Sequence, residues 1–185
     1  ILNIGGISNI TVIENIESSE FFSKDIGPGN CLIDNWIRNN SSKRFDQNGI
    51  LANKGIINEI ILEQAQELFS NRPNSNYSLD TNDFDVSFAR GLSLEDGAAT
   101  LTKFTAKIIS SAINELLNEK NKFLEIIVCG GGRKNFTLIN DLKMNLKKDF
   151  FLKNIDDYGI NGDFIESQAF AYLAIRSILR LPISF

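Results

Sequence analysis

The sequence predicts an α/β fold in which an N-terminal group of strands is followed mainly by helices. Two observations carry this prediction. β-rich apolar runs stand on both sides of Gly5-Gly6, and later segments place apolar residues three and four positions apart. The expected order is β-β-β-α, further helices, β-α, a short strand near Phe150 and a final helix.

The strands are expected where apolar residues cluster between glycine breaks. Residues 2–4 and 7–13 predict a hairpin around the glycine pair, and residues 20–26 predict a third strand that ends before Gly27-Pro28-Gly29. A fourth strand, at 124–129, runs into a triple glycine.

Helices are expected where the apolar spacing follows the helical period. The segments are 30–39, 56–69, 96–118, 134–147 and 164–179. Asp96 is the expected N-cap of the longest helix. The polar stretch 70–85 is predicted to be a surface loop.

Composition narrows the classes of function. The chain has 185 residues, which suits one domain or two small lobes, and 19 basic against 23 acidic residues leave a net charge of -4. No positive excess exists to neutralise nucleic acid, and no long apolar run indicates a membrane span. The absence of histidine excludes a Ser-His-Asp triad and a His-ligated zinc built from this chain alone. The chain opens at Ile1 inside an apolar run, so we expect it to be an excerpt that lacks an N-terminal portion.

The glycine pair of the hairpin is the first candidate binding element. Gly5 and Gly6 let backbone amides approach an anion, and Ser8 and Asn9 add side-chain donors at the same bend. The alternative is an ordinary hairpin turn that uses glycine for its backbone angles.

A second candidate is the corner Asp25-Ile26-Gly27-Pro28-Gly29-Asn30, which joins a strand end to a helix start. Backbone donors at a helix N-terminus attract anions. Asn30 and Asp34 are four residues apart and share one helical face. The alternative is a capped turn with Asn30 as the N-cap.

Two later motifs complete the candidate set. The run Gly130-Gly131-Gly132 before Asn135 permits a nucleoside to pack on bare backbone, although it matches neither the Walker A loop nor the dinucleotide fingerprint; the alternative is a tight turn. Asp163 and Glu166 have the spacing of a capping box. The functional alternative makes Glu166 a carboxylate that binds a sugar hydroxyl or handles a proton.

In order and spacing, the strings at 3–11, 25–34, 91–102, 129–135 and 166–171 resemble the anhydro-N-acetylmuramic acid kinase family. The resemblance covers nearly the whole chain and corresponds to about the C-terminal half of such an enzyme. It implies an actin-like ATPase lobe, of the sugar kinase, hexokinase-like and ribonuclease H-like type, with a mixed sheet flanked by helices. Residues 1–185 would then be the C-terminal ATP-binding lobe of a two-lobe kinase whose N-terminal lobe is absent from this chain.

The resemblance also implies an activity. The family uses ATP and Mg²⁺ to open the 1,6-anhydro ring of anhydro-N-acetylmuramic acid with water and to phosphorylate O6, which gives N-acetylmuramic acid 6-phosphate for cell-wall recycling. It implies a cytoplasmic enzyme whose partners are ATP and a small amino sugar, with a homodimer as a further expectation. The alternatives are another actin-like kinase lobe that acts on a different sugar or an acyl group, and a non-catalytic nucleotide-binding module.

Site residues follow from the resemblance position by position. The residues implied to bind the cofactor are Gly5, Gly6, Ser8, Asn9, Gly27, Gly29, Asn30, Gly130, Gly131, Gly132 and Asn135. Asp25 and Glu166 are implied to bind the sugar, and the metal ligands are left unassigned. The general base, an aspartate, is expected in the missing N-terminal half, so the chain holds no catalytic residue and is expected to be inactive alone.

Overall fold

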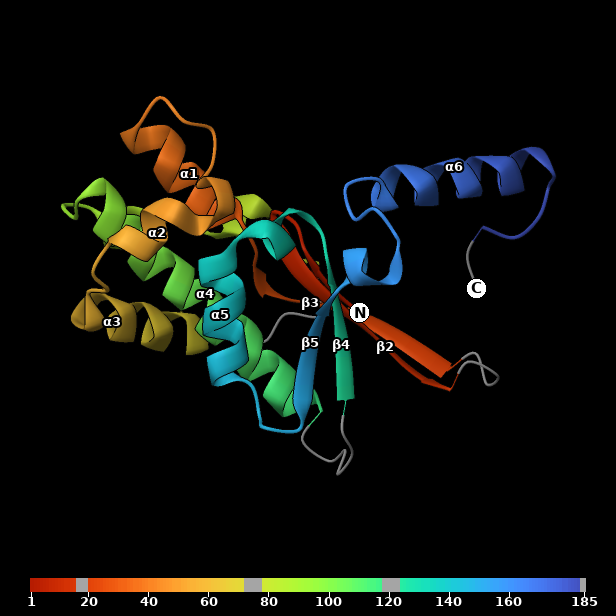
Figure 1. Ribbon diagram of the computed structural model, residues 1–185, viewed down its shortest axis with the longest axis horizontal. Helices are drawn as coiled ribbons and strands as arrows, with labels where there is room; N and C mark the ends of the chain where they lie inside the picture. Colours follow the sequence, from red (N-terminus) through yellow and green to blue (C-terminus); the bar gives the residue numbers. More distant parts are fainter. Residues whose placement is uncertain (16–19, 72–77, 118–123, 184–185) are drawn as a thin grey trace.

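The centre of the protein is one mixed five-stranded β-sheet, seen in a computed structural model that describes residues 1–15, 20–71, 78–117 and 124–183 (Figure 1). The strand order is β3-β2-β1-β4-β5; β1, β2 and β3 are antiparallel neighbours, whereas β4 runs parallel to both β1 and β5. The strands are β1 (Leu2–Ile4), β2 (Ile7–Asn15), β3 (Glu20–Pro28), β4 (Leu124–Cys129) and β5 (Phe150–Asn154). The α/β class, the mixed sheet and the strand near Phe150 are confirmed.

The register of the sheet separates an inner from an outer face. Leu2 pairs with Ile10 on one side and Val128 on the other, and all three side chains are buried. Because side chains alternate along a strand, their neighbours form an outward row at the same end of the sheet. This outward row is Asn3, Asn9 and Asp25, each half-buried, together with Cys129, which is buried.

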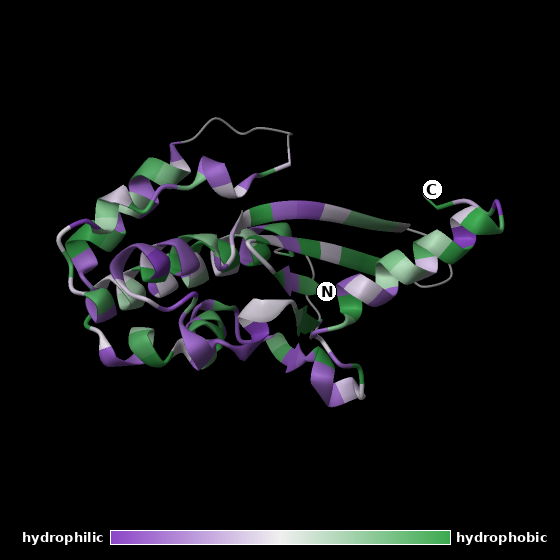
Figure 2. Ribbon diagram, turned by 90° about the horizontal axis from the view of Figure 1, so that it is seen from above, coloured by the Kyte–Doolittle hydropathy of each residue, from purple (hydrophilic) through white to green (hydrophobic). Residues whose placement is uncertain are grey.

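Helices α1–α5 lie on the inner side of the sheet, and α6 lies apart on the other side (Figures 1 and 2). The helices are α1 (Cys31–Asn40), α2 (Ile50–Lys54), α3 (Glu59–Ser70), α4 (Leu94–Leu116), α5 (Phe136–Asn145) and α6 (Ile165–Ile178). Within the described residues, no helix combines the length and apolar character that a membrane span needs.

Two hydrophobic cores share helix α4. Ile109 and Ile113 join the core between the sheet and α5, whereas Leu101 and Phe104 join a second core with α1 and α3. The second core includes Trp36, whose ring leaves no space for a side chain at residue 97: a Cβ there would lie 2.2 Å from the indole. Glycine at this position lets α1 and α4 pack closely.

The N-cap of helix α4 lies three residues earlier than the sequence predicts. Ser93 is the N-cap, since its hydroxyl accepts a hydrogen bond of 3.1 Å from the amide of Asp96. The predicted role of Asp96 as N-cap is therefore wrong; its carboxylate accepts from the amide of Ile56 at 2.7 Å and ties the segment before α3 to α4. The predicted last residue of this helix, Asn118, lies outside the described residues.

Other boundaries shift because side chains cap helices at unexpected positions. Asn58 accepts from the amide of Ile61, so α3 begins at Glu59 rather than at residue 56. The loop predicted at 70–85 includes residues 72–77, which lie outside the described residues, and a 3-10 turn, Thr81–Asp83, that was not predicted. Helix α2, with five residues, was also missed.

Candidate functional site

The hairpin bend between β1 and β2 is bonded directly to the start of α1. The carbonyl of Gly6 accepts from the amides of Gly29 at 2.9 Å and Cys31 at 3.1 Å, and the carbonyl of Gly5 accepts from the amide of Asn30 at 2.7 Å. Two of the predicted glycine motifs, more than twenty positions apart in sequence, are therefore joined by backbone hydrogen bonds. We call these joined segments the backbone layer.

The contact between these motifs requires glycine at position 29. A Cβ there would lie 2.3 Å from the carbonyl oxygen of Gly5, which is backbone and cannot turn aside. Asn30 holds the same contact from its side chain, because its Nδ2 donates to the carbonyls of Gly5 at 3.1 Å and Ile4 at 3.4 Å. Asn30 occupies the N-cap position of α1 but makes no side-chain cap, so the capped-turn interpretation is wrong.

The triple glycine joins the same layer from β4. Gly130 has a φ of +77°, and a Cβ there would lie 2.4 Å from Oδ1 of Asn3; at Gly132 it would lie 2.2 Å from Cγ2 of Ile4. Gly131 has no such neighbour, since the nearest atom is Nδ2 of Asn30 at 3.8 Å. The carboxyl ends of the parallel strands β1 and β4 thus meet at one sheet edge, which is where ligands bind in open α/β sheets.

The predicted glycines differ in exposure, and Gly5 and Gly130 are half-buried. Gly6 and Gly131 are exposed at the edge, whereas Gly27, Gly29 and Gly132 are buried. The amides of Gly5, Gly29 and Asn30 already donate to carbonyls within the protein. An anion at this edge would therefore meet the backbone at the exposed pair, and the buried glycines shape the loops that present it.

Three residues predicted to bind the cofactor instead make contacts within the protein, through a side chain or through the backbone. Ser8 is fully buried and its Oγ donates to the carbonyl of Pro28 at 3.1 Å. Asn135 is 5% exposed and its Oδ1 accepts from the amide of Leu138, which makes it the N-cap of α5. Gly27 has a φ of +151° and packs so closely on α4 that a Cβ would lie 2.6 Å from Cγ2 of Ile108.

The 3-10 turn at Thr81–Asp83 lies beside the candidate site, next to Gly6. The sequence did not predict this turn. A Cβ at Gly6 would lie 3.1 Å from Cγ2 of Thr81, and the carboxylate of Asp25 accepts from the amide of Leu79 at 2.9 Å. The available signal was the spacing of Asp80 and Asp83, which form a capping box. The predicted sugar ligand Asp25 therefore belongs to the outward row and is bonded to the segment just before this turn.

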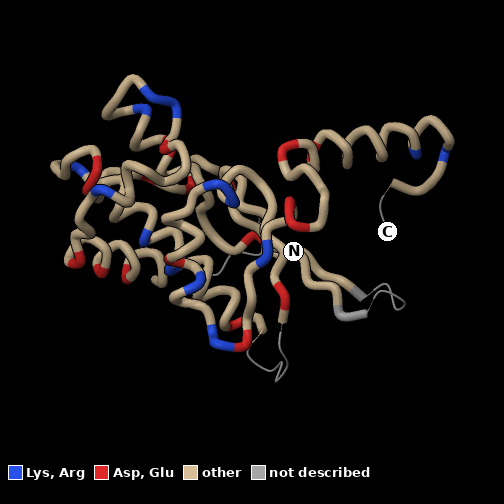
Figure 3. Tube along the Cα trace, viewed as in Figure 1, with Lys and Arg blue, Asp and Glu red and all other residues tan. Residues whose placement is uncertain are grey.

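Arg133 fastens the triple-glycine loop to the segment that leads into α6. Its guanidinium donates to the carbonyl of Gly130 at 3.1 Å and pairs with Asp156 at 2.9 Å and with Asp163 at 3.0 Å. Lys134 adds a second pair with Asp163 at 2.6 Å. Acidic and basic positions are interspersed along the chain as a whole (Figure 3). The hydrogen bond from Arg133 holds the pKa of Asp156 below its ordinary value.

Asp163 is therefore an ion-pair partner and not a helix cap. Phe164 occupies the N-cap position of α6 and makes no side-chain cap, so the predicted capping box with Glu166 is wrong. Glu166 is exposed in the first turn of α6. Asp163, three residues earlier, is the residue that the ion pairs connect to the loop after β4.

Asp34 is a titratable group close behind the start of α1. Burial raises the pKa of its carboxyl to about 6; Arg38 lowers it in part, and Asp46 raises it further. The carboxylate of Asp46 accepts from the amides at the start of α2, at 2.8 Å and 2.9 Å. We therefore expect Asp34 to change protonation near pH 6, above the usual range of an aspartate.

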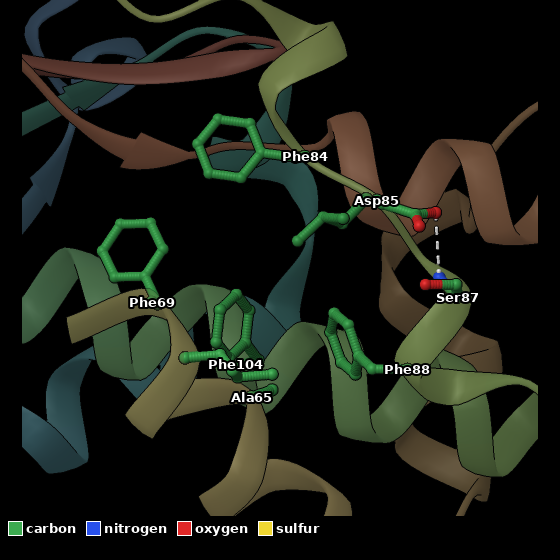
Figure 4. Close-up of a pocket in the computed structure, with 9 residues that line it drawn as sticks. Ala65, Phe69, Phe84, Asp85, Ser87, Phe88 and Phe104 are labelled. Atoms are coloured by element: carbon green, nitrogen blue, oxygen red, sulfur yellow. Dashed lines mark hydrogen bonds between the residues drawn. The ribbon is translucent and has the colours of Figure 1, made fainter. Parts of the chain in front are cut away.

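A cavity of about 190 Å³ lies within the second core (Figure 4). Four phenylalanines dominate its lining: Phe69, Phe84, Phe88 and Phe104. Asp85 and Ser87 are its polar members, and the carboxylate of Asp85 accepts from the amide of Ser87 at 3.0 Å. This lining suits an apolar group and offers no backbone cradle for phosphate.

The fold and the glycine edge define an α/β protein with a backbone-lined candidate site at the carboxyl ends of its parallel strands. The family model described as "Anhydro-N-acetylmuramic acid kinase" matches residues 1–185. The chain belongs to this family.

Relatives of the same description agree with this assignment. The Anhydro-N-acetylmuramic acid kinase of Pelagibacter ubique (strain HTCC1062) is 52% identical over the whole chain, and that of Zymomonas mobilis is 38% identical. The chain spans about half the length of these relatives, 50% and 49% respectively. A solved structure, "Activator of the 2-Hydroxyisocaproyl-CoA Dehydratase from Clostridium difficile with bound ADPNP", has a TM-score of 0.47 at 13% identity and covers 82% of this chain and 52% of its own; a likeness this low adds nothing to the assignment.

Proposed function

We propose that the chain is the nucleotide-binding lobe of a kinase that adds water across the 1,6-anhydro bond of anhydro-N-acetylmuramic acid and transfers the γ-phosphoryl group of ATP to O6. The observation that carries the proposal is the meeting of three glycine motifs at one sheet edge in a member of this family. Phosphoryl transfer depends mostly on positioning and charge neutralisation, for which exposed backbone amides are suited.

The chain's own residues would divide this work. The exposed Gly6 and Gly131 would admit the phosphates, and the buried glycines around them would keep the loops rigid. Asp25, a half-buried member of the outward row, would bind a sugar hydroxyl, and Glu166 would do so from the start of α6.

Magnesium fits this arrangement as a companion of the nucleotide. The described residues include no group of three or more acidic, cysteine or histidine side chains able to hold a metal ion. Mg²⁺ at kinase sites needs only one or two protein carboxylates, because the phosphates supply further ligands. When bound, it would neutralise charge on the transferring phosphoryl group.

A binding experiment tests the role of the glycine edge. Isothermal titration of the chain with Mg-ATP is expected to show binding that Gly131→Val weakens at least tenfold. A side chain at residue 131 has open space in the free protein, so the variant is expected to fold normally. Ser111→Val, at an exposed position on α4, is the control and is expected to bind like the parent chain. Equal affinity for both variants would contradict the site.

A turnover experiment tests the reaction. The chain alone is expected not to phosphorylate anhydro-N-acetylmuramic acid. Joined to the half that the Pelagibacter relative possesses and this chain does not span, it is expected to yield N-acetylmuramic acid 6-phosphate, detected by mass spectrometry. Phosphorylation of other sugars in preference to this one would overturn the substrate assignment, and turnover by the chain alone would overturn the need for a second half.

A further inference from the structure

The phenylalanine-lined cavity of the second core is not used by the proposed function. None of the described residues that line it is among those implied to bind ATP or the sugar. Buried side chains close it on one side, including Leu32 at 1% and Phe104 at 3% exposure, whereas Asp85 and Ser87 border it as exposed residues. The cavity is therefore a pocket that opens to solvent beside a carboxylate.

On α1, the pocket is lined by the face that is turned away from Asn30. Leu32 lines the pocket and lies two positions from Asp34, which is about 200° around a helix axis. Asn30 shares the face of Asp34, and its side chain reaches the carbonyl of Gly5 at the glycine edge. A ligand in the pocket would therefore not compete directly with one at that edge.

Four aromatic rings surround the pocket (Figure 4). The ring centre of Phe69 lies 6.2 Å from that of Phe84 in a stacked arrangement and 6.0 Å from that of Phe104 in an edge-on arrangement, and Phe88 lies 5.5 Å from Phe104. Such walls present both ring faces and ring edges, which pair favourably with a further aromatic ring. An apolar cavity of about 150 Å³ takes up benzene, so about 190 Å³ accommodates one substituted ring.

The charge at the opening selects among aromatic ligands. Of the described residues that line the pocket, Asp85 alone is charged. The hydroxyl and the amide of Ser87 donate to its carboxylate, the amide at 3.0 Å, and these bonds hold the pKa of Asp85 below its ordinary value. The group is therefore ionised at neutral pH and has lone pairs left to accept from an ammonium group. Ring faces also attract a cation.

We propose that this pocket binds a small aromatic amine, with its ring among the four phenylalanines and its ammonium group at the carboxylate of Asp85. An aromatic acid of the same shape would bring like charge to Asp85, and an aliphatic amine would leave the aromatic walls without a partner. The inference concerns a site separate from the glycine edge and holds whether or not the chain binds ATP.

One wall of the pocket belongs to a segment that also borders the candidate site. Phe84 lines the pocket, and Leu79, five residues earlier, packs against the same core and donates its amide to Asp25. Between them, Thr81 lies beside Gly6. A ligand that contacts Phe84 would therefore restrain this segment, so the pocket has a physical connection to the edge through which its occupancy can be felt.

Isothermal titration tests the ligand class. The probe is 2-phenylethylammonium, which is expected to bind one-to-one and at least fivefold more tightly than phenylacetate, a ligand with the same ring and the opposite charge. Asp85→Asn keeps an acceptor for the amide of Ser87 and removes the charge, and it is expected to abolish this preference. The matched control is Glu67→Gln, at an exposed position of α3 outside the lining, which is expected to keep the preference. No binding of the amine at millimolar concentration, or equal binding of the acid, would overturn the proposal.

Two further measurements place the ligand in the pocket. Ala65→Phe fills the space between the rings and is expected to weaken binding of the amine at least tenfold; if this variant fails to fold, the Asp85→Asn comparison decides. Hydrogen exchange, measured by mass spectrometry, is expected to slow in residues 79–88 when the amine is added. Unchanged exchange in this segment, or loss of binding when the chain is joined to the unmatched half of the Pelagibacter relative, would also overturn the proposal.

Discussion

Gly29→Ala is the most direct test of how the candidate site is built. The new Cβ would lie 2.3 Å from the carbonyl oxygen of Gly5, about 1 Å inside normal contact, so α1 and the hairpin bend must separate. Separation breaks the backbone bonds from Gly29 to Gly6 and from Asn30 to Gly5, and the side-chain bond from Asn30 to Gly5. At about 1 kcal/mol for each bond, the expected loss is roughly 3 kcal/mol in the free energy of unfolding.

The assay is urea unfolding followed by fluorescence of Trp36, the only tryptophan, which is 4% exposed on α1 directly after the corner. Gly131→Ala is the matched control: its Cβ would lie 3.8 Å from the nearest atom, and its unfolding midpoint is expected to equal that of the parent chain. If both alanine variants unfold at the same urea concentration, the close backbone layer described here is wrong.

Three further changes test individual interactions. Burial raises the pKa of Asp34 from 3.8 to about 6, so the carboxyl stabilises the fold below pH 4 and that contribution is lost as the pH rises through 6. Asp34→Asn is therefore expected to stabilise by about 1 kcal/mol at pH 7, after discounting for solvent screening, and not at pH 4; equal urea midpoint shifts at both pH values would refute this. Among the described residues the hydroxyl of Thr105 is buried without a partner, so Thr105→Val is expected to raise stability by about 1 kcal/mol in the same assay. Arg133→Met is expected to speed hydrogen exchange in the loop 130–132, measured by mass spectrometry, with Lys134→Met as the milder control; unchanged exchange would show that the Arg133 contacts do not hold the loop.

The strands and glycine motifs could be predicted because their signals are local. Apolar runs broken by glycine predict the ends of β1, β2 and β4 to within a few residues, and the triple glycine follows directly after β4. The family resemblance stated from these strings is confirmed over residues 1–185. The assignment of individual residues to ATP or sugar stays a prediction.

The helix caps and side-chain partners could not be predicted in the same way. They depend mainly on contacts between segments that are distant in sequence, which residue spacing does not reveal. Nothing near Asn30 in sequence indicates that its amide turns to the carbonyls of Ile4 and Gly5 instead of capping α1. Asp163 has the right spacing for a cap, but two cations brought by the loop after β4 offer it stronger partners. Helix α2 is too short, at five residues, to show a helical period.

Helix α4 runs through both hydrophobic cores and so couples them structurally. Its C-terminal half is buried under the sheet and its N-terminal half against α1 and α3. Because loss of either core removes buried contacts from this helix, we expect the two cores to unfold together. The fluorescence of Trp36, in one core, should therefore follow the same denaturation curve as the far-ultraviolet circular dichroism of the whole lobe.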